Sequence, residues 1–353
     1  MLKKIFRTIK AICLGYKTPK CTGIDLGSLT TKMVELKSNT LQIAQYSLSN
    51  IEGELISVTS GIVDVEKLSE HILKQWNTFK SKSENIAIAI PHDAVIIKEF
   101  EIPKISNMYT RYDYIKRLIV KDLEVDELDF DYTIKSNIGD NQIARVVVAK
   151  KEKIEEYQAV VQLTGLNTAA IEVDSFGVID LLTRLVNKYQ IVNQTVFIDI
   201  GSNSLKTYVF VNGSFEIYKD LSIEVNQLLV GVWLKIGSSD KVDYPSLFDY
   251  LLGNSQNSTI ICDYMLEQFS ILFNILKNNL LLENQISLSS NCRIYLFGGN
   301  SLIPSLRAKL NQQFNNNVYF IDELLPENKH IPQEILVRLI GAISLATWGN
   351  NAA

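Results

Sequence analysis

The chain has 353 residues, 46% of them hydrophobic and 21% charged, which predicts about two folded domains and excludes extensive disorder. Its formal net charge of -4 provides no large basic surface, so nucleic acid is not expected as a partner. The four cysteines contain no CxxC pair and the three histidines are scattered, which argues against a zinc site or a disulfide framework and favours a reduced cytoplasmic setting.

The first twenty residues predict a basic amphipathic N-terminal segment. They carry six lysine or arginine residues and no acidic one, and their apolar residues recur at helical spacing. Such a segment can lie peripherally on an anionic membrane surface, and a tail or a short helix packed on the body is an equal alternative. No apolar run reaches the roughly 18 residues that cross a bilayer, and Lys10 interrupts the apolar stretch that a signal peptide would need.

A first β-hairpin is predicted around residues 23–32, which read Gly-Ile-Asp-Leu-Gly-Ser-Leu-Thr-Thr-Lys. Apolar residues continue the second strand as far as Leu36. The turn contains the Gly-Ser element, and glycine lets a backbone turn tightly and approach a ligand closely. Exposed turn N–H groups and hydroxyls form an anion site, so this hairpin is a candidate phosphate loop.

Residues 94–163 predict a small βαββα module. The expected elements are a strand over 94–102, a helix over 108–123, strands over 130–134 and 143–149, and a helix over 151–163. Acidic residues gather between Asp122 and Asp131. They can attract a basic peptide, although a run of this kind is more commonly a solvated face.

A second copy of the hairpin motif is found at residues 197–206, which read Phe-Ile-Asp-Ile-Gly-Ser-Asn-Ser-Leu-Lys. Ile, Asp, Gly, Ser and Lys coincide in register with the first copy. One such motif alone is usually an ordinary turn, whereas two copies about half a chain apart favour a duplicated fold. Two facing hairpins can clamp a nucleoside triphosphate, and an aspartate in each can hold Mg²⁺ through water.

A third element follows near the C-terminus. Residues 293–297 predict a buried strand that runs into Gly298-Gly299-Asn300-Ser301, and a helix is expected from Pro304 onward. A glycine pair between a strand and a helix lets a ring or a phosphate approach the backbone at the positive end of the helix.

The three elements, in this order, resemble the actin, Hsp70 and sugar kinase superfamily, and further motifs resemble the PilM family of type IV pilus assembly proteins more closely. These motifs are the basic N-terminus before residues 23–28, then residues 86–91, 100–104, 165–166 and 173–176. The resemblance covers nearly the whole chain. It implies an α/β fold that is actin-like (ribonuclease H-like) and duplicated into two domains, with the inserted subdomain 1C found in PilM and in the division protein FtsA.

The implied domain boundaries follow that fold. They are 1-20 for the N-terminal segment, 21-92 and 166-192 for subdomain 1A, 93-165 for subdomain 1C, 193-334 for the second domain with 2B inserted at about 219-290, and 335-353 for a C-terminal helix returning to 1A.

The resemblance also implies the ligands, ATP and Mg²⁺, and their binding residues. The first phosphate loop comprises Asp25, Gly27, Ser28, Leu29, Thr30 and Lys32, the second comprises Asp199, Gly201, Ser202 and Asn203, and the nucleoside loop comprises Gly298, Gly299, Asn300 and Ser301. Asp25 and Asp199 would hold the metal through water, and Lys32 would neutralise phosphate oxygens. Asp174 stands where relatives carry a glutamate used in hydrolysis, which makes it the catalytic candidate, although its residue type and place favour an N-cap. ATP binding with weak or absent hydrolysis is therefore expected.

The function implied by the resemblance is a cytoplasmic one at the inner membrane of a Gram-negative bacterium. In the PilM family, the cleft between subdomains 1A and 1C receives the N-terminal cytoplasmic peptide of the inner-membrane protein PilN, so this peptide is the expected partner. The chain would then link the inner-membrane pilus platform, and the pilus motor, to the cytoplasmic machinery. The alternatives are an FtsA-like membrane-associated scaffold and a sugar-kinase or phosphohydrolase-type enzyme of the same superfamily.

Overall fold

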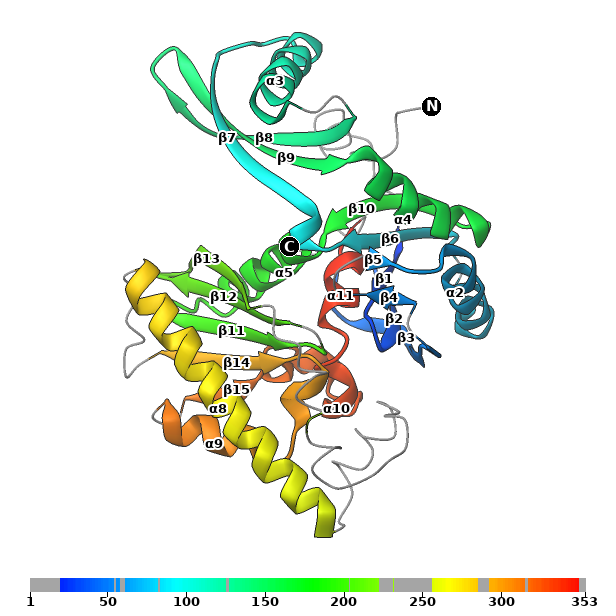
Figure 1. Cartoon of the computed structure of the whole chain (residues 1–353), viewed down its shortest axis with the longest axis vertical. Helices are drawn as coiled ribbons and strands as arrows, with labels where there is room; N and C mark the ends of the chain where they lie inside the picture. Colours follow the sequence, from blue (N-terminus) through cyan, green and yellow to red (C-terminus); the bar gives the residue numbers. More distant parts are fainter. Residues whose placement is uncertain are drawn as a thin grey trace.

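A computed structural model describes most of the chain (Figure 1). The described residues are 20–53, 55–57, 61–81, 83–124, 127–202, 204–221, 231, 256–284, 292–314 and 317–348. The predicted amphipathic segment therefore lies outside them except for Lys20, and so does much of the predicted insertion between 219 and 290.

The first sheet contains five strands in the order β10-β6-β1-β2-β3. Their bounds are β1 (Thr22–Leu26), β2 (Thr30–Leu36), β3 (Ile43–Asn50), β6 (Asn85–Ile90) and β10 (Asn167–Val173). β1, β2 and β3 pair antiparallel, whereas β6 and β10 add in parallel on the other side of β1. A small hairpin of β4 (Ile56–Ser57) and β5 (Gly61–Ile62) lies beside this sheet.

The second sheet repeats this topology in the order β13-β12-β11-β14-β15. Its strands are β11 (Thr195–Ile200), β12 (Leu205–Val211), β13 (Ser214–Leu221), β14 (Arg293–Phe297) and β15 (Val318–Phe320). Again the first three pair antiparallel and the last two add in parallel. The predicted duplication is therefore present in the strand order, and the strand predicted over 293–297 has the predicted bounds.

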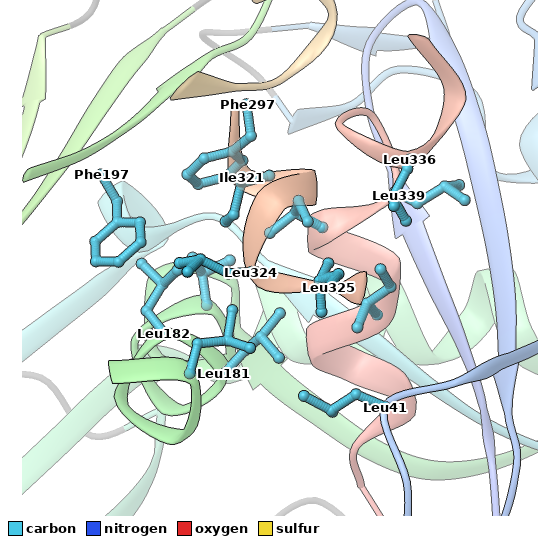
Figure 2. Packing of buried hydrophobic residues seen from close by; sticks show 14 of the residues in the cluster. Leu41, Leu181, Leu182, Phe197, Phe297, Ile321, Leu324, Leu325, Leu336 and Leu339 are labelled. Atoms are coloured by element: carbon cyan, nitrogen blue, oxygen red, sulfur yellow. The ribbon is translucent and has the colours of Figure 1, made fainter. Parts of the chain in front are cut away.

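Two helices lie between the sheets, α5 (Asp174–Lys188) and α11 (Ile340–Ala346) (Figure 1). The core around them takes apolar side chains from both sheets and from the turns η3 (Ile321–Leu324) and η4 (Pro326–Asn328) and the short helix α10 (Gln333–Leu336). Figure 2 shows Leu181 and Leu182 of α5 close to Ile321 and Leu324 in this core. Because side chains alternate along a strand, the opposite faces of the two sheets are also apolar and need a cover.

The outer cover of the first sheet is α2 (Val65–Phe79) and α4 (Lys151–Leu163), which share a second core with β1, β6 and β10. The outer cover of the second sheet is α8 (Gln256–Asn284) and α9 (Leu306–Gln313). The resulting layers are helices, sheet, helices, sheet and helices. Within the described residues, no helix is long and apolar enough to cross a membrane.

A separate three-stranded sheet, in the order β7-β9-β8, forms a module beside the first sheet (Figure 1). It contains β7 (Val95–Pro103), α3 (Met108–Leu123), β8 (Leu128–Ile138) and β9 (Asn141–Lys150), with the short turn η1 (His92–Ala94) leading in from β6. The predicted βαββα order is confirmed, and both helices have the predicted bounds. Of the described helices, α3 alone covers the module's own core, because the buried side chains of α4 pack into the core of the first sheet.

The helix predicted from Pro304 begins later. α9 starts at Leu306, and the Gly-Gly loop instead leads into a single turn of 3₁₀ helix, η2 (Gly299–Leu302). The reason is local: Ser305 has a positive φ of 64°, which the α-helix does not tolerate, so helical geometry starts only after it.

Candidate nucleotide-binding cleft

A cavity of about 540 Å³ lies between the two sheets, and the three predicted loops line it. The predicted site residues in its wall are Asp25, Gly27, Ser28, Leu29, Thr30, Lys32, Asp174, Asp199, Gly201, Ser202, Gly298, Gly299 and Asn300. Asn203 lies outside the described residues. Ser301 is fully buried and is not part of the wall; its hydroxyl donates to the carbonyl of Gly298 at 2.7 Å and so shapes the loop from behind.

The two hairpins place equivalent residues on opposite sides of the cavity. Asp25 pairs with Lys32 across β1 and β2, and Asp199 pairs with Lys206 across β11 and β12. The turns themselves meet, because the hydroxyls of Ser28 and Ser202 share a hydrogen bond of 2.7 Å. The repeat seen in the sequence therefore becomes a pair of facing loops that close one end of the cavity.

The first loop is held by an ion pair and by glycines. Lys32 Nζ lies 3.0 Å from Asp25 Oδ2, with only 14% of the lysine side chain exposed. A Cβ on Gly27 would lie 2.6 Å from Lys32 Nζ, and a Cβ on Gly341 of α11 would lie 2.8 Å from Asp25 Oδ2. A Cβ on Gly27 would also lie 2.9 Å from the carbonyl oxygen of Thr30, so the turn itself favours glycine there, whereas a Cβ on Gly341 would displace the Asp25 side chain.

The third loop requires glycine at Gly298. Its φ is +85°, and a Cβ there would overlap with Asp199 Oδ1 and approach the carbonyl of Ile200 at 2.6 Å. The Gly298 N–H donates to the carbonyl of Val337 at 2.9 Å, and the Asn300 amide donates to the carbonyl of Gly201 at 2.7 Å. These bonds fasten the third loop to the second loop and to the segment that leads into α11.

A charged cluster at the other end of the cavity contains residues that the sequence prediction missed. Lys206 pairs with Asp174 of α5, and the Tyr218 hydroxyl donates to Asp220 at 3.2 Å. The His92 ring lies 4.4 Å from the Tyr218 ring. Lys206 was visible in the sequence as a coincident position of the repeat. Tyr218 and Asp220 come from β13 and His92 comes from η1, and no shared motif links them.

The position of Asp174 corrects one prediction. α5 has Val173 as its N-cap, with no side-chain cap, and Asp174 is the first residue of the helix. One oxygen of Asp174 accepts from the N–H of Ser175, and the other forms an ion pair with the ammonium of Lys206. The expected N-cap role was therefore wrong, because the N-cap is one residue earlier and Asp174 lies inside the helix.

Burial and like charges raise the pKa values of two carboxylates in this cluster. Burial raises the pKa of Asp199 to about 6, with Asp25 and Asp174 adding to the effect and Lys206 opposing it. Burial likewise raises the pKa of Asp220. Burial opposes protonation of Lys206, but Asp174 and Asp199 outweigh it and raise the lysine's pKa, so Lys206 is charged at neutral pH.

The residues present fit a nucleotide with a bound cation. The cavity volume lies within the roughly 300–1,000 Å³ of small-molecule sites. A Cβ on Gly299 would meet no atom within 4 Å, so this side of the loop faces open space. Among the described residues, the wall carries five aspartates against four lysine or arginine side chains, so a polyphosphate needs a cation of its own. Among the described residues, no three His, Cys, Asp or Glu side chains are grouped to ligate a metal directly.

A second polar region lies where the module meets the first sheet. Asp129 and Asp131 of β8 pair with Ala149 and Val147 of β9, and the latter two pack in the core of the first sheet. Paired residues share a face, so both aspartates point toward the first sheet. Burial raises the pKa of Asp131 to about 6, and Asp129 Oδ2 is buried with no hydrogen-bond partner among the residues that the structure describes. The acidic run is therefore not simply a solvated face.

Glu172 of β10 belongs to the same region. Burial raises its pKa to about 7, and the nearby carboxylate of Asp131 adds to the rise. Asp122, by contrast, lies at the surface and pairs with Lys98 at 3.0 Å.

Comparisons with known proteins agree with the architecture. The family model described as type IV pilus assembly protein PilM matches residues 23–222. The chain is similar to a solved structure of the PilM-PilN type IV pilus biogenesis complex, with a TM-score of 0.76 and 16% identity over 94% of this chain and 99% of that one. No curated protein sequence matches the chain.

More distant structures share the fold. Ethanolamine utilization protein EutJ from Carboxydothermus hydrogenoformans has a TM-score of 0.55 and 12% identity over 94% of this chain and 90% of that one. MreB5 of Spiroplasma citri bound to ADP has a TM-score of 0.50 and 12% identity over 92% and 95%. The predicted actin-like fold is thereby confirmed.

Proposed function

The chain belongs to the PilM family of type IV pilus assembly proteins, and we propose that it binds ATP with Mg²⁺ in the cavity between its two hairpins. The observation that carries this proposal is the pair of facing turns joined by Ser28 and Ser202, with an Asp/Lys pair behind each. Turn N–H groups of this kind bind anions, and the lysines supply point charges for phosphate oxygens. Asp25 and Asp199 would hold the hydrated Mg²⁺.

The nucleoside would lie against the third loop, at Gly298, Gly299 and Asn300. Support comes from the open space beside Gly299 and from the fastening of this loop to the second phosphate loop through Asn300. Hydrolysis is proposed to be slow or absent. Asp174 is the catalytic candidate, and its pairing with Lys206 leaves it a poor base for the water that would attack a terminal phosphate.

The nucleotide proposal is tested by calorimetric titration of the intact chain with ATP, with and without Mg²⁺. We expect saturable binding that weakens at least tenfold without Mg²⁺, because the cavity wall is net negative. Lys32→Met should weaken binding about 10-fold to 100-fold by removing one charge-assisted contact. Absence of ATP binding in the presence of Mg²⁺ would rule the proposal out.

We further propose that the chain binds the N-terminal peptide of PilN in the cleft between the module and the first sheet, corresponding to subdomains 1C and 1A. The similarity to a PilM-PilN complex supports PilN as the partner. The carboxylates of Asp129, Asp131 and Glu172 at this junction support a basic group on the bound peptide, because such a group would relieve the cost of burying them.

The peptide proposal is tested by titrating the intact chain with a PilN N-terminal peptide, with and without Mg-ATP. Asp131→Asn should weaken the peptide about tenfold by removing one charged partner. Glu99→Gln is the matched control, since Glu99 lies on the exposed face of the same module and pairs with Arg145 and Lys135 there. Equal affinities for all three proteins would place the peptide elsewhere.

In this account the protein works in the cytoplasm at the inner membrane of a Gram-negative bacterium. Bound PilN would connect it to the inner-membrane platform, and its other surfaces would contact the cytoplasmic machinery, including the pilus motor. Residues 1–20 would add peripheral membrane contact through their six basic side chains. Co-sedimentation of the full chain with anionic and neutral vesicles tests that last point, since only the anionic vesicles should retain it.

A further inference from the structure

The two Asp/Lys pairs of the hairpins have the same register but different partners. Lys32 bonds to Asp25, which is its own partner across the strands. Lys206 also lies opposite an aspartate, Asp199, yet its ammonium pairs with Asp174. Asp174 belongs to α5, which follows strand β10 of the first sheet. Lys206 therefore reaches from the second sheet to a carboxylate that the first sheet positions.

The surroundings of Lys206 hold it inside the cavity. Lys206 and Asp174 both line the cavity wall, with 20% and 25% of their side chains exposed. Asp199 and Asp220 also act on the ammonium electrostatically. The His92 ring contacts the Tyr218 ring at an interplanar angle of 44°, and His92 shares a hydrogen bond of 2.6 Å with Ser175, so these residues border this end of the cavity.

We propose that Lys206 is a second phosphate-binding lysine, one that reads the terminal phosphate of a nucleoside triphosphate, with Asp174 as the counter-ion that holds it when that phosphate is absent. This inference rests on the proposed nucleotide function and assigns a distinct role to each lysine. Lys32 binds phosphates that are present in both a diphosphate and a triphosphate. Lys206 binds only the terminal phosphate, which the diphosphate lacks.

The arrangement favours this assignment for an electrostatic reason. The wall already carries more aspartates than lysine and arginine side chains, so a further phosphate is repelled unless a cation turns toward it. A lysine ammonium has three donors and a flexible stem, so Lys206 can exchange a carboxylate for a phosphate oxygen without leaving the cavity. Asp174 then competes with the terminal phosphate for Lys206.

This competition gives the two partners opposite predicted effects. Removing Lys206 should weaken triphosphate binding, whereas neutralising Asp174 should strengthen it, because the lysine no longer has to be released. A metal-binding role for Asp174 predicts the reverse, since its loss would then weaken the Mg²⁺-bound triphosphate, and a purely catalytic role predicts no change in affinity. A purely structural ion pair between the two sheets predicts equal changes for both nucleotides.

The test measures dissociation constants of a non-hydrolysable ATP analogue and of ADP, both with Mg²⁺, by calorimetry on the intact chain. We expect Lys206→Met to weaken the analogue about 10-fold to 100-fold while ADP stays within about twofold. Asp174→Asn should tighten the analogue about 3-fold to 10-fold and tighten ADP by less than about twofold, because one negative charge leaves the wall for both nucleotides. Lys32→Met, the matched lysine of the first hairpin, should weaken both nucleotides alike.

Equal changes for both nucleotides in Lys206→Met, or weaker or unchanged binding of the analogue in Asp174→Asn, would overturn the inference while leaving the nucleotide function intact. If Lys206→Met does not fold, Asp174→Asn still decides, because it removes a negative charge from a crowded acidic cluster and keeps the lysine. Wild-type protein that binds neither nucleotide would overturn both the inference and the function beneath it.

Discussion

Gly298 is the residue on which the contact between the third loop and Asp199 depends. Its φ of +85° is strained for any residue with a Cβ, and that Cβ would overlap with Asp199 Oδ1. We expect Gly298→Ala to lower the free energy of unfolding by about 1–3 kcal/mol from backbone strain alone and to displace Asp199 from the cavity. Urea unfolding and ATP titration measure the two effects.

Gly299→Ala is the matched control for that substitution. The neighbouring glycine has no positive φ, and a Cβ there would meet no atom within 4 Å. Its stability should stay within about 0.5 kcal/mol of wild type. If the two variants lose equal stability, the account of Gly298 is incorrect.

Glu172 gives the fold a pH dependence. Its pKa is raised from 4.5 to about 7 in the folded state, so between these values the folded chain binds more protons than the unfolded chain. The free energy of unfolding therefore falls as the pH rises through this window, by about 3 kcal/mol at most for this group.

Glu172→Gln should remove that dependence, because its amide is neutral at every pH. At pH 8 the variant should unfold at higher urea concentration than wild type, and near pH 4 the advantage should vanish. Part of the gain will be lost, because the carboxylate accepts bonds from Val173 N and from the Trp348 side chain and an amide has only one acceptor oxygen. A stability difference that does not change between pH 4 and pH 8 would refute this assignment.

Site residues that belong to a local sequence motif were predictable, whereas residues that separate elements bring to the cavity were not. Asp25, Lys32 and Asp199 could be found because glycine-containing turns leave a sequence signature, and the structure brings them to one cavity. His92 and Asp220 join the cavity through packing of α5 and β13, which no local pattern encodes. The N-cap prediction for Asp174 failed because the N-cap is Val173, one residue earlier, so Asp174 lies inside the helix and its carboxylate bonds to the N–H of Ser175 and to a distant lysine.

Among the elements, η4 and β3 are joined by the fully buried amide of Asn328. Its Oδ1 accepts from the N–H of Ile43 at 2.8 Å, and its Nδ2 donates to the carbonyl of Leu41 at 3.0 Å. Asn328→Ala would leave both backbone groups buried and unpaired, so we expect a loss of about 2–4 kcal/mol in the free energy of unfolding.

Gln333→Ala is the control for the Asn328 substitution, since its amide bonds to Asp322 at 2.7 Å in an exposed position of the same segment. That change should cost less than about 1 kcal/mol. Chemical denaturation of both variants, followed by circular dichroism, makes the comparison. A similar small loss in both would mean that Asn328 does not contribute to joining these elements.

The elements that carry their own pattern were predicted well. α3 and α4 have the predicted bounds, because each combines a helical apolar period with a clear start and end. The sequence did not predict which sheet α4 packs against, since its apolar face suits the module's sheet and the first sheet equally. In the structure it packs against the first sheet. The start of α9 was misplaced because the positive φ of Ser305 has no signature in a serine.

At the scale of the whole molecule, duplication explains the location of the cavity. Two sheets of identical strand order face each other across α5 and α11, so equivalent turns meet at the same place (Figure 1). The module is attached through η1 and through the start of α4, and residues of both segments line the cavity. The nucleotide site and the proposed peptide cleft thus share structural elements.

The central claim is that one nucleotide contacts both hairpins and the third loop at once, and hydrogen–deuterium exchange tests it most directly. Exchange of the intact chain with and without Mg-ATP should reveal slower exchange in peptides covering residues 27–30, 201–204 and 298–301 together, because N–H groups in all three loops would face the ligand. ATP binding that protects one loop only, or protects segments elsewhere and none of the three, would contradict the account.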